Sequence, residues 1–332
     1  MINEVVNLGN TYYNYNYKNT ELVKRTYRFS NDFFERWINF LDVSKGTINT
    51  YTKSIRQFLL FLQNNRVTQP TRETVIAFRE YSKLHLKPTT VQCYLMAVRN
   101  FFRWTEEEGL YPDVAKNVRG LKIDYGFKKD YLTPSQVRYM LHRINRSTVT
   151  GVRNYAIILL MVTTGIRTIE VQRANIEDIR NVADFTALFV QGKGHDDKNE
   201  YVKLEKPVLD AINEYLTYRS DLRGSSPLFA DAYKVKESMN RRLTTRMISK
   251  IAKDCMYEAG IDGDRFCAHS LRHTTATLNL LNGGTVQETK QLLRHARLDT
   301  TLIYCHNLER AKNNSEARVT QAILGRYKVE DF

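Results

Sequence analysis

The chain has 332 residues, of which 42% are hydrophobic and 26% are charged, and its net charge is +14. This composition is that of a globular protein, and the length allows one to three domains with cores of their own. Two classes are excluded: no apolar run approaches the roughly 20 residues of a membrane span, and the four scattered cysteines form neither a disulfide framework nor a C-x-x-C zinc site.

The excess of positive charge indicates a polyanionic partner, with nucleic acid as the first candidate. A merely basic, soluble enzyme is the alternative. The first 27 residues are rich in asparagine and tyrosine and lack the apolar core of a signal peptide. We therefore expect a cytoplasmic protein with reduced cysteines and no contact with a membrane.

Residues 1–28 are predicted to be an extension without regular structure. They show no helical period, and the tyrosines between Tyr12 and Tyr17 are too dense in asparagine to indicate a strand. A disordered or loosely docked segment is the simplest interpretation.

Residues 29–110 are predicted to form a four-helix domain. Apolar residues recur at intervals of three and four from about Ser30, and Ser44, Thr71 and Pro88 each open a further such pattern. The exposed positions of these helices are basic, and a single such charge is more often solvated surface than a phosphate contact. They include Lys45, Lys53, Arg56, Lys87, Arg99 and Arg103.

Residues 111–130 are predicted to be a linker, because they combine Pro112, Gly120 and Gly126 with several basic side chains. A basic strap of this kind suits two domains that enclose DNA. A generic flexible linker would have a similar composition.

Residues 131–332 form the second predicted domain, which we expect to be mostly helical with a small antiparallel sheet. Thr133-Pro134-Ser135-Gln136 has the residues of an N-terminal capping box with proline at the first helical position. An apolar run that stops at Gly165 indicates a buried helix and its end. The other expected elements are a short helix from Thr168, a turn at 176–179, strands at 185–190 and 201–204, helices at 207–219 and 243–260, helices carrying His269, His295 and Tyr304, and an apolar helix at about 319–324.

A group of polar residues in the second domain has the chemistry of a phosphate site. His269 and Arg272 are three apart, so a helix projects both from one face. An imidazole beside a guanidinium recognises anions, and arginine binds phosphate oxygens bidentately. Arg167 follows the helix-ending glycine, and Lys193 lies between two glycines where a hairpin tip is expected. The tyrosine that comes last could attack the phosphate.

In sequence order these residues resemble those of the tyrosine recombinases, also called the phage-integrase family. The three-residue step from His269 to Arg272 and the nine-residue step from His295 to Tyr304 match the pattern of that family. The resemblance extends from about Phe29 to the C-terminus, and the short N-terminal extension is similar to that of the Xer-like, arm-less members. The six matching residues are Arg167, Lys193, His269, Arg272, His295 and Tyr304.

This resemblance implies a site-specific recombinase that cleaves and rejoins double-stranded DNA through a 3′-phosphotyrosine, without metal, ATP or cofactor. It implies a homotetramer on DNA and a monomer or dimer off DNA. The fold that it implies is mainly α, with a SAM-like core-binding domain at 29–110 and a catalytic domain at 131–332. The basic residues of the first domain would then contact phosphates.

The resemblance also implies a role for each site residue. Arg167 and Arg272 neutralise the non-bridging phosphate oxygens, and Glu170 supports Arg167. His295 donates a further hydrogen bond to the phosphate, and His269 assists proton removal from the attacking tyrosine.

The sequence departs from the usual pattern of the family at two positions. The implied general acid for the departing 5′ oxygen is Lys193, but the hairpin is longer than the common form and Lys198 is an alternative. Arg294 stands where the family usually has glycine, so packing or DNA contact is expected to differ there.

Other functions stay open. An integrase of a mobile element and a type IB topoisomerase have the same chemistry, and a catalytically silent DNA-binding protein could have the same scaffold. A metal-dependent nuclease would use His269 and His273 as ligands, although no carboxylate lies between them as in H-E-x-x-H.

Overall fold

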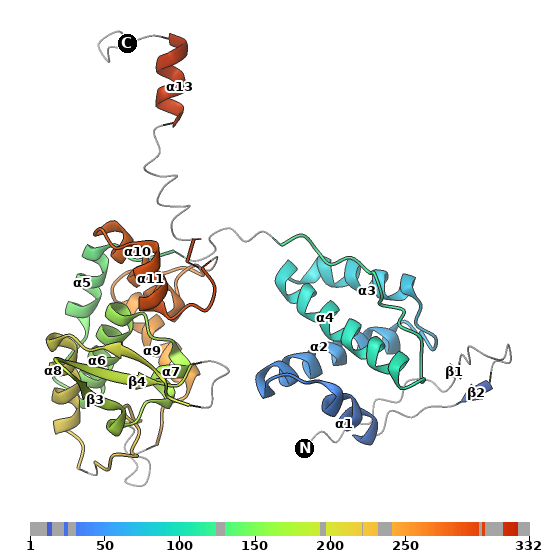
Figure 1. Cartoon of the computed structure of the whole chain (residues 1–332), viewed down its shortest axis with the longest axis horizontal. Helices are drawn as coiled ribbons and strands as arrows, with labels where there is room; N and C mark the ends of the chain where they lie inside the picture. Colours follow the sequence, from blue (N-terminus) through green and yellow to red (C-terminus); the bar gives the residue numbers. More distant parts are fainter. Residues whose placement is uncertain are drawn as a thin grey trace. The chain divides into compact units, whose positions relative to one another are not determined.

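The computed structural model describes residues 12–14, 23–25, 31–123, 130–192, 197–220, 222–231, 241–298, 301–302 and 315–324. The chain divides into two compact units, Met1–Tyr125 and Gly126–Phe332. Both are mainly helical, and the second contains a three-stranded antiparallel sheet, so the predicted fold class is confirmed (Figure 1). No helix within the described ranges is long and apolar enough to cross a membrane.

A short antiparallel ribbon precedes the first helix. Strand β1 (Tyr12–Asn14) pairs with β2 (Val23–Arg25), and Tyr12 lies opposite Arg25. The prediction of no regular structure is therefore wrong for these two segments, because tyrosine and valine favour strands even where asparagines surround them. The rest of the N-terminal extension lies outside the described residues.

The first unit contains the four predicted helices. Local caps set where they begin: the Ser44 side chain accepts from the N–H of Thr47, and Thr71 forms a capping box with Thr74. The apolar faces of the helices meet in one core that is rich in aromatic rings packed edge to face. The helices are α1 (Asn31–Phe40), α2 (Lys45–Asn64), α3 (Arg72–His85) and α4 (Pro88–Glu107).

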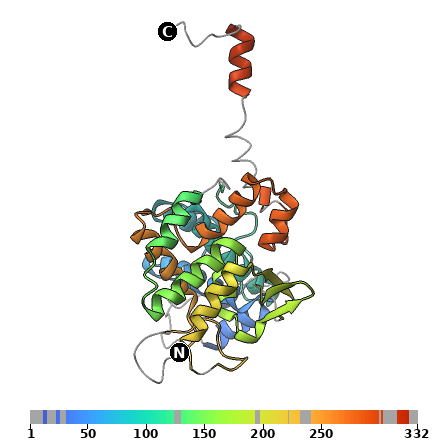
Figure 2. The ribbon, with the colours of Figure 1, turned by 90° about the vertical axis from the view of Figure 1, so that its left-hand side faces the viewer.

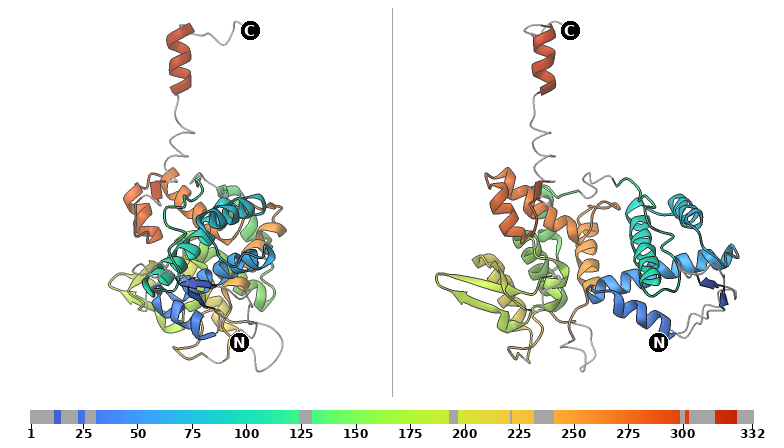
Figure 3. Two further views of the ribbon diagram at one scale, coloured as in Figure 1. Left: turned by 90° about the vertical axis from the view of Figure 1, so that its right-hand side faces the viewer. Right: turned by 45° about the vertical axis from the view of Figure 1, so that its right-hand side comes forward.

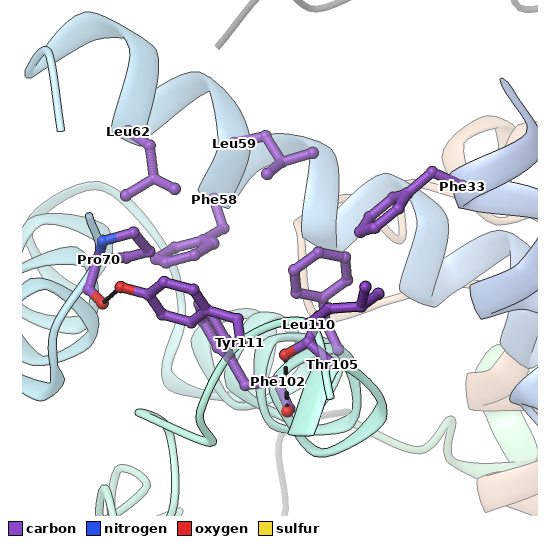
Figure 4. A pocket seen from close by; sticks show the side chains of 10 residues that line it. Phe33, Phe58, Leu59, Leu62, Pro70, Phe102, Thr105, Leu110 and Tyr111 are labelled. Carbon is purple, nitrogen blue, oxygen red and sulfur yellow. Dashed lines mark hydrogen bonds between the residues drawn. The ribbon is translucent and has the colours of Figure 1, made fainter. Parts of the chain in front are cut away.

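The chain that follows α4 packs on this bundle, although the sequence predicts a linker there. Ala115 and Val118 are buried in the bundle core, and Arg99 donates to the carbonyl of Val118. The hydroxyl of Tyr111 donates to the carbonyl of Pro70 over 2.8 Å at the edge of an apolar pocket (Figure 4). Burial raises the pKa of Tyr111 to about 12. The first unit therefore includes residues beyond its last helix.

The second unit surrounds one apolar core with helices and places its sheet to one side of them (Figures 2 and 3). The sheet has the order β3-β4-β5, and both pairs are antiparallel. The strands are β3 (Ile179–Val182), β4 (Phe185–Val190) and β5 (Glu200–Lys203). The helices are α5 (Pro134–Arg143), α6 (Val149–Thr164), α7 (Thr168–Arg173), α8 (Lys206–Thr217), α9 (Thr245–Glu258), α10 (Ala268–Leu281), α11 (Val286–Leu293) and α13 (Ser315–Leu324).

Strand β3 is absent from the sequence-based prediction. The predicted turn is present as a 3-10 helix, η1 (Ile176–Asp178), but the chain then continues directly into β3. Half of that short strand is polar, so its own sequence gives a weak signal. Pairing with β4, where Ile179 lies opposite Leu188, stabilises it.

Helix α6 is the central helix of the second unit and packs against α8 and α10. It ends at Gly165, which has the left-handed φ of 62°. A Cβ at this position would lie 2.6 Å from Cδ2 of Leu293, the last residue of α11, so a larger residue would require that side chain to move. Gly165 therefore brings the end of α11 close to the end of α6, and the candidate site forms at this junction.

Candidate active site

Arg272 joins the ends of two helices. It lies in the first turns of α10 with 2% of its surface exposed, and its guanidinium donates to the carbonyls of Gly165 and Leu293. The last carbonyls of a helix have no partner within the helix and carry partial negative charge. They hold the guanidinium in one orientation, so little ordering remains for phosphate binding.

Arg167 is held by a buried carboxylate. Its Nη1 donates to Oε1 of Glu170 over 2.6 Å, its backbone N–H donates to Oε2 over 2.8 Å, and its Nη2 donates to the carbonyl of Arg294 over 3.1 Å. Glu170 is fully buried. Burial opposes its ionisation, but the adjacent guanidiniums and the backbone N–H outweigh that cost and hold the pKa of the carboxyl below its usual value. Glu170 is therefore a charged anchor for Arg167.

His295 lies just after α11 and not on a helix, which corrects the prediction. Arg294, the residue before it, has φ 54° and ψ 52° and ends the helix. The His295 Nδ1 lies 2.9 Å from Oγ1 of Thr301, which is fully buried. Burial, and then the charges of Arg272 and Arg167, lower the pKa of His295 to about 3. The imidazole is therefore neutral at physiological pH in the absence of DNA.

His269 lies on a helix, as predicted: it is in the first turn of α10, and it is exposed. Its ring and that of His273 meet edge to face, with centroids 4.6 Å apart and planes at 83°. No group of three or more histidine, cysteine or carboxylate side chains gathers to hold a metal ion in the part of the chain that the structure describes.

Arg167, His269 and Arg272 line one cavity of about 710 Å³. Its lining also includes three basic residues of α9 that the sequence analysis missed. They occur at intervals of four and three, which places them on one face of the helix, but on an amphipathic helix such charges are usually solvated. They are Arg246, Lys250 and Lys253.

Residues 130–310 match the family described as "Phage integrase family", and residues 32–109 match "Phage integrase, N-terminal SAM-like domain". The chain belongs to the phage integrase family. It is thus a tyrosine recombinase, an enzyme that cleaves and rejoins DNA at specific sites.

Relatives of this recombinase cover most of the chain. Tyrosine recombinase XerD of Listeria innocua is 28% identical over an alignment of 287 residues, which covers 83% of this chain and 94% of that protein. The XerH site-specific recombinase in a post-cleavage complex with its difH substrate has a TM-score of 0.68 at 21% identity, covering 85% and 84% of the two chains. A lambda integrase tetramer bound to a Holliday junction has a TM-score of 0.62 at 16% identity, covering 81% and 75%. These two structures share the fold of the recombinase.

Two of the six matching residues, Lys193 and Tyr304, lie outside the described residues. Two contacts hold the base of the hairpin that carries Lys193. Nη1 of Arg173 donates to the carbonyl of Gly192 over 3.1 Å. Just before β5, Lys198 forms an ion pair with the buried carboxylate of Asp178 at 2.5 Å.

The six basic residues of the first domain that are predicted to bind DNA differ in their exposure and in their hydrogen-bond partners. Arg99 is half-buried and donates to a backbone carbonyl of its own unit, and Arg103 donates to Oδ1 of Asn100. Their contact with DNA stays a prediction. The other four, Lys45, Lys53, Arg56 and Lys87, are exposed.

Proposed function

We propose that this recombinase exchanges DNA strands through a 3′-phosphotyrosine formed by Tyr304, in a homotetrameric synapse of the Xer-like type. The observation that carries the proposal is the pair of fixed guanidiniums, Arg167 and Arg272, which line one cavity and lie close to the neutral imidazole of His295. The similarity to XerD, which covers 94% of that protein, supports the Xer-like assignment. The fold shared with the lambda integrase tetramer on a Holliday junction supports four copies.

In the proposed cleavage step the Tyr304 phenol oxygen attacks phosphorus, and the bond from phosphorus to the 5′ oxygen breaks. A free tyrosine has a pKa near 10, so roughly one in a thousand is ionised at neutral pH and the proton must leave during attack. His269, on the exposed edge of the cavity, accepts it. Another 5′ hydroxyl can reverse the step, because the phosphotyrosine keeps the energy of the phosphodiester.

The negative charge that grows on the non-bridging oxygens is stabilised by groups that are already in place. Arg272 is fixed by the carbonyls of Gly165 and Leu293. Such preorganised donors are the largest contribution in many enzymes, since they need no rearrangement at the moment of reaction. When the Thr301 hydroxyl donates to Nδ1 of His295, the imidazole proton is on Nε2 and can be donated to the phosphate.

Lys193 is the proposed general acid, and the ion pair of Lys198 supports that choice. Proton transfer from Lys198 would remove the ion-pair partner of the carboxylate of Asp178, which is 1% exposed. Weakening the compensation of a buried charge is costly. Lys198 is better suited to hold the base of the hairpin.

The test is a nicked duplex whose cleaved end diffuses away, so that the covalent intermediate accumulates. Tyr304→Phe should keep DNA affinity and form no covalent complex, and wild-type protein should form it in excess EDTA. Tyr257→Phe is the control, since Tyr257 is 65% exposed and is not among the residues that line the cavity. A covalent complex with Tyr304→Phe would refute the assignment of the nucleophile. Loss of the wild-type complex on chelation would favour the nuclease hypothesis.

A further inference from the structure

Arg294 has a backbone conformation that is unfavourable for arginine. Its φ of 54° and ψ of 52° lie in the left-handed region, which suits glycine and is unfavourable for other residues. Its side chain is nevertheless 6% exposed, so it is folded inward rather than directed to solvent. The inward contacts must offset the backbone cost.

Those contacts reach the anchor of Arg167. The Arg294 Nη2 donates to Oε2 of Glu170 over 2.7 Å, and its Nη1 donates to the carbonyl of Leu292 over 3.1 Å. Its own carbonyl accepts from Nη2 of Arg167. Arg294 thus touches Arg167 through its backbone and the partner of Arg167 through its side chain.

This arrangement changes the charge of the site. One buried carboxylate, Glu170, is shared by two guanidiniums, so the three groups keep a net positive charge. With glycine at position 294 the carboxylate would face Arg167 alone and neutralise it more fully. A guanidinium that is less neutralised attracts a phosphate oxygen more strongly.

A second acidic residue lies on the other side of Arg294. This residue is Glu200, whose Oε2 lies 3.9 Å from Nε of Arg294. That Nε makes no hydrogen bond to any residue that the structure describes. Glu200 is the first residue of β5, and the hairpin of Lys193 returns into that strand. Arg294 therefore connects the Glu170 anchor with the base of the hairpin.

We propose that Arg294 is a positioning residue for two parts of the cleavage reaction, the stabilisation of the phosphate by Arg167 and the protonation of the departing 5′ oxygen by Lys193. Through Glu170 it orients and charges Arg167, and through Glu200 it fixes the hairpin that presents Lys193. The inference rests on the proposed roles of Arg167 and Lys193. It assigns to Arg294 no contact with DNA.

The experiment compares Arg294→Gly, Glu200→Gln and the double variant on the nicked duplex, with saturating protein and a single turnover. Arg294→Gly should cleave about tenfold more slowly, the equivalent of about 1.4 kcal/mol, with DNA affinity unchanged within about twofold. Glu200→Gln should have a smaller effect. The double variant should be no slower than Arg294→Gly, because Glu200 acts through Arg294.

A substrate with sulfur in place of the departing 5′ oxygen separates the effect on Arg167 from the effect on Lys193. Sulfur leaves without a proton, so it should restore Glu200→Gln to the wild-type rate. It should restore Arg294→Gly only in part, since Arg167 stays misplaced. Arg294→Lys, which keeps a charge near Glu170, should recover part of the rate on the ordinary substrate.

Several results would overturn the inference. A wild-type rate for Arg294→Gly, or equal losses in rate and affinity, would show that Arg294 does not position Arg167. Additive losses in the double variant would show that Glu200 acts on its own. If Arg294→Gly does not fold, Glu200→Gln and its rescue by sulfur still decide, because the Glu200 side chain is 42% exposed. Failure of the proposed function is distinct, since wild-type protein would then form no covalent complex.

Discussion

In the first unit the buried polar residues among those described carry only hydroxyls, whereas the second unit also buries full charges. Ser54 and Thr105 satisfy their hydroxyls within their own helices, at the carbonyls of Thr50 and Phe102. A buried charge needs more compensation than one such bond supplies, and here each buried charge also has partners from other segments. Among the described residues of the second unit, the buried charges are Arg153, Glu170, Asp178 and Arg272.

This difference indicates that the core of the first unit mainly serves folding, whereas the buried charges of the second unit mainly serve catalysis. An apolar core contributes to folding in proportion to the area that it buries and to the quality of its packing. A network of buried charges contributes less to folding, but it fixes donors where a reaction needs them. Substitutions in the first unit should therefore change its unfolding, and substitutions in the site should change the rate of cleavage.

The largest effect is expected for the general acid. Lys193→Ala should lower the rate of cleavage by about 10²–10⁴, the usual contribution of general acid catalysis. The 5′-sulfur substrate should restore it. Lys198→Ala, measured on the same substrates, should change the rate little and lower the denaturation midpoint, because Asp178 loses its partner. Rescue of Lys198→Ala and not of Lys193→Ala would reverse the assignment.

A core substitution tests the first unit alone. Phe58 is fully buried, and Phe58→Ala should lower the free energy of unfolding by about 3–5 kcal/mol. Both tryptophans of the chain, Trp37 and Trp104, lie in this core, so their fluorescence during urea unfolding reports on this unit. Leu84→Ala is the control, since Leu84 is 79% exposed and its loss should stay within about 0.5 kcal/mol. Equal shifts for the two variants would contradict the comparison.

Arg272→Ala tests the site. It should slow cleavage by about 10²–10³, with no rescue by sulfur, because its charge is needed on the phosphate. The tryptophan unfolding curve should stay where it is, since the hydrogen bonds of Arg272 to Gly165 and Leu293 lie within the second unit. A variant that cleaves normally would remove Arg272 from the proposed mechanism.

The smallest effect is a pH dependence. Without DNA the pKa of His295 is about 3, below its reference value near 6.5. Between these values the unfolded chain binds a proton that the folded chain does not, so stability should fall as the pH falls from about 6.5 towards 3. His295→Gln should reduce that slope between about pH 6.5 and pH 4.5, measured by circular dichroism in urea. An identical slope would mean that other groups cause it.

The sequence by itself predicts what neighbouring residues decide. The four helices of the first unit, the helix start at Thr71, the capping box at Thr133 and the helix end at Gly165 all depend on contacts within three or four residues. The order and spacing of the six matching residues also sufficed to indicate the family, which the comparisons confirm. These features are readable because helix periodicity and capping are local properties.

Only the tertiary structure decided which charges meet. Arg294 and Glu170 are 124 residues apart, and Arg272 and Gly165 are 107 apart, yet each pair is hydrogen-bonded. The sequence marked Arg294 as unusual but could not distinguish a DNA contact from a buried partner for Glu170. The physical reason is that charges attract through space at short range, and the packing of α6, α10 and α11 determines which of them come within that range.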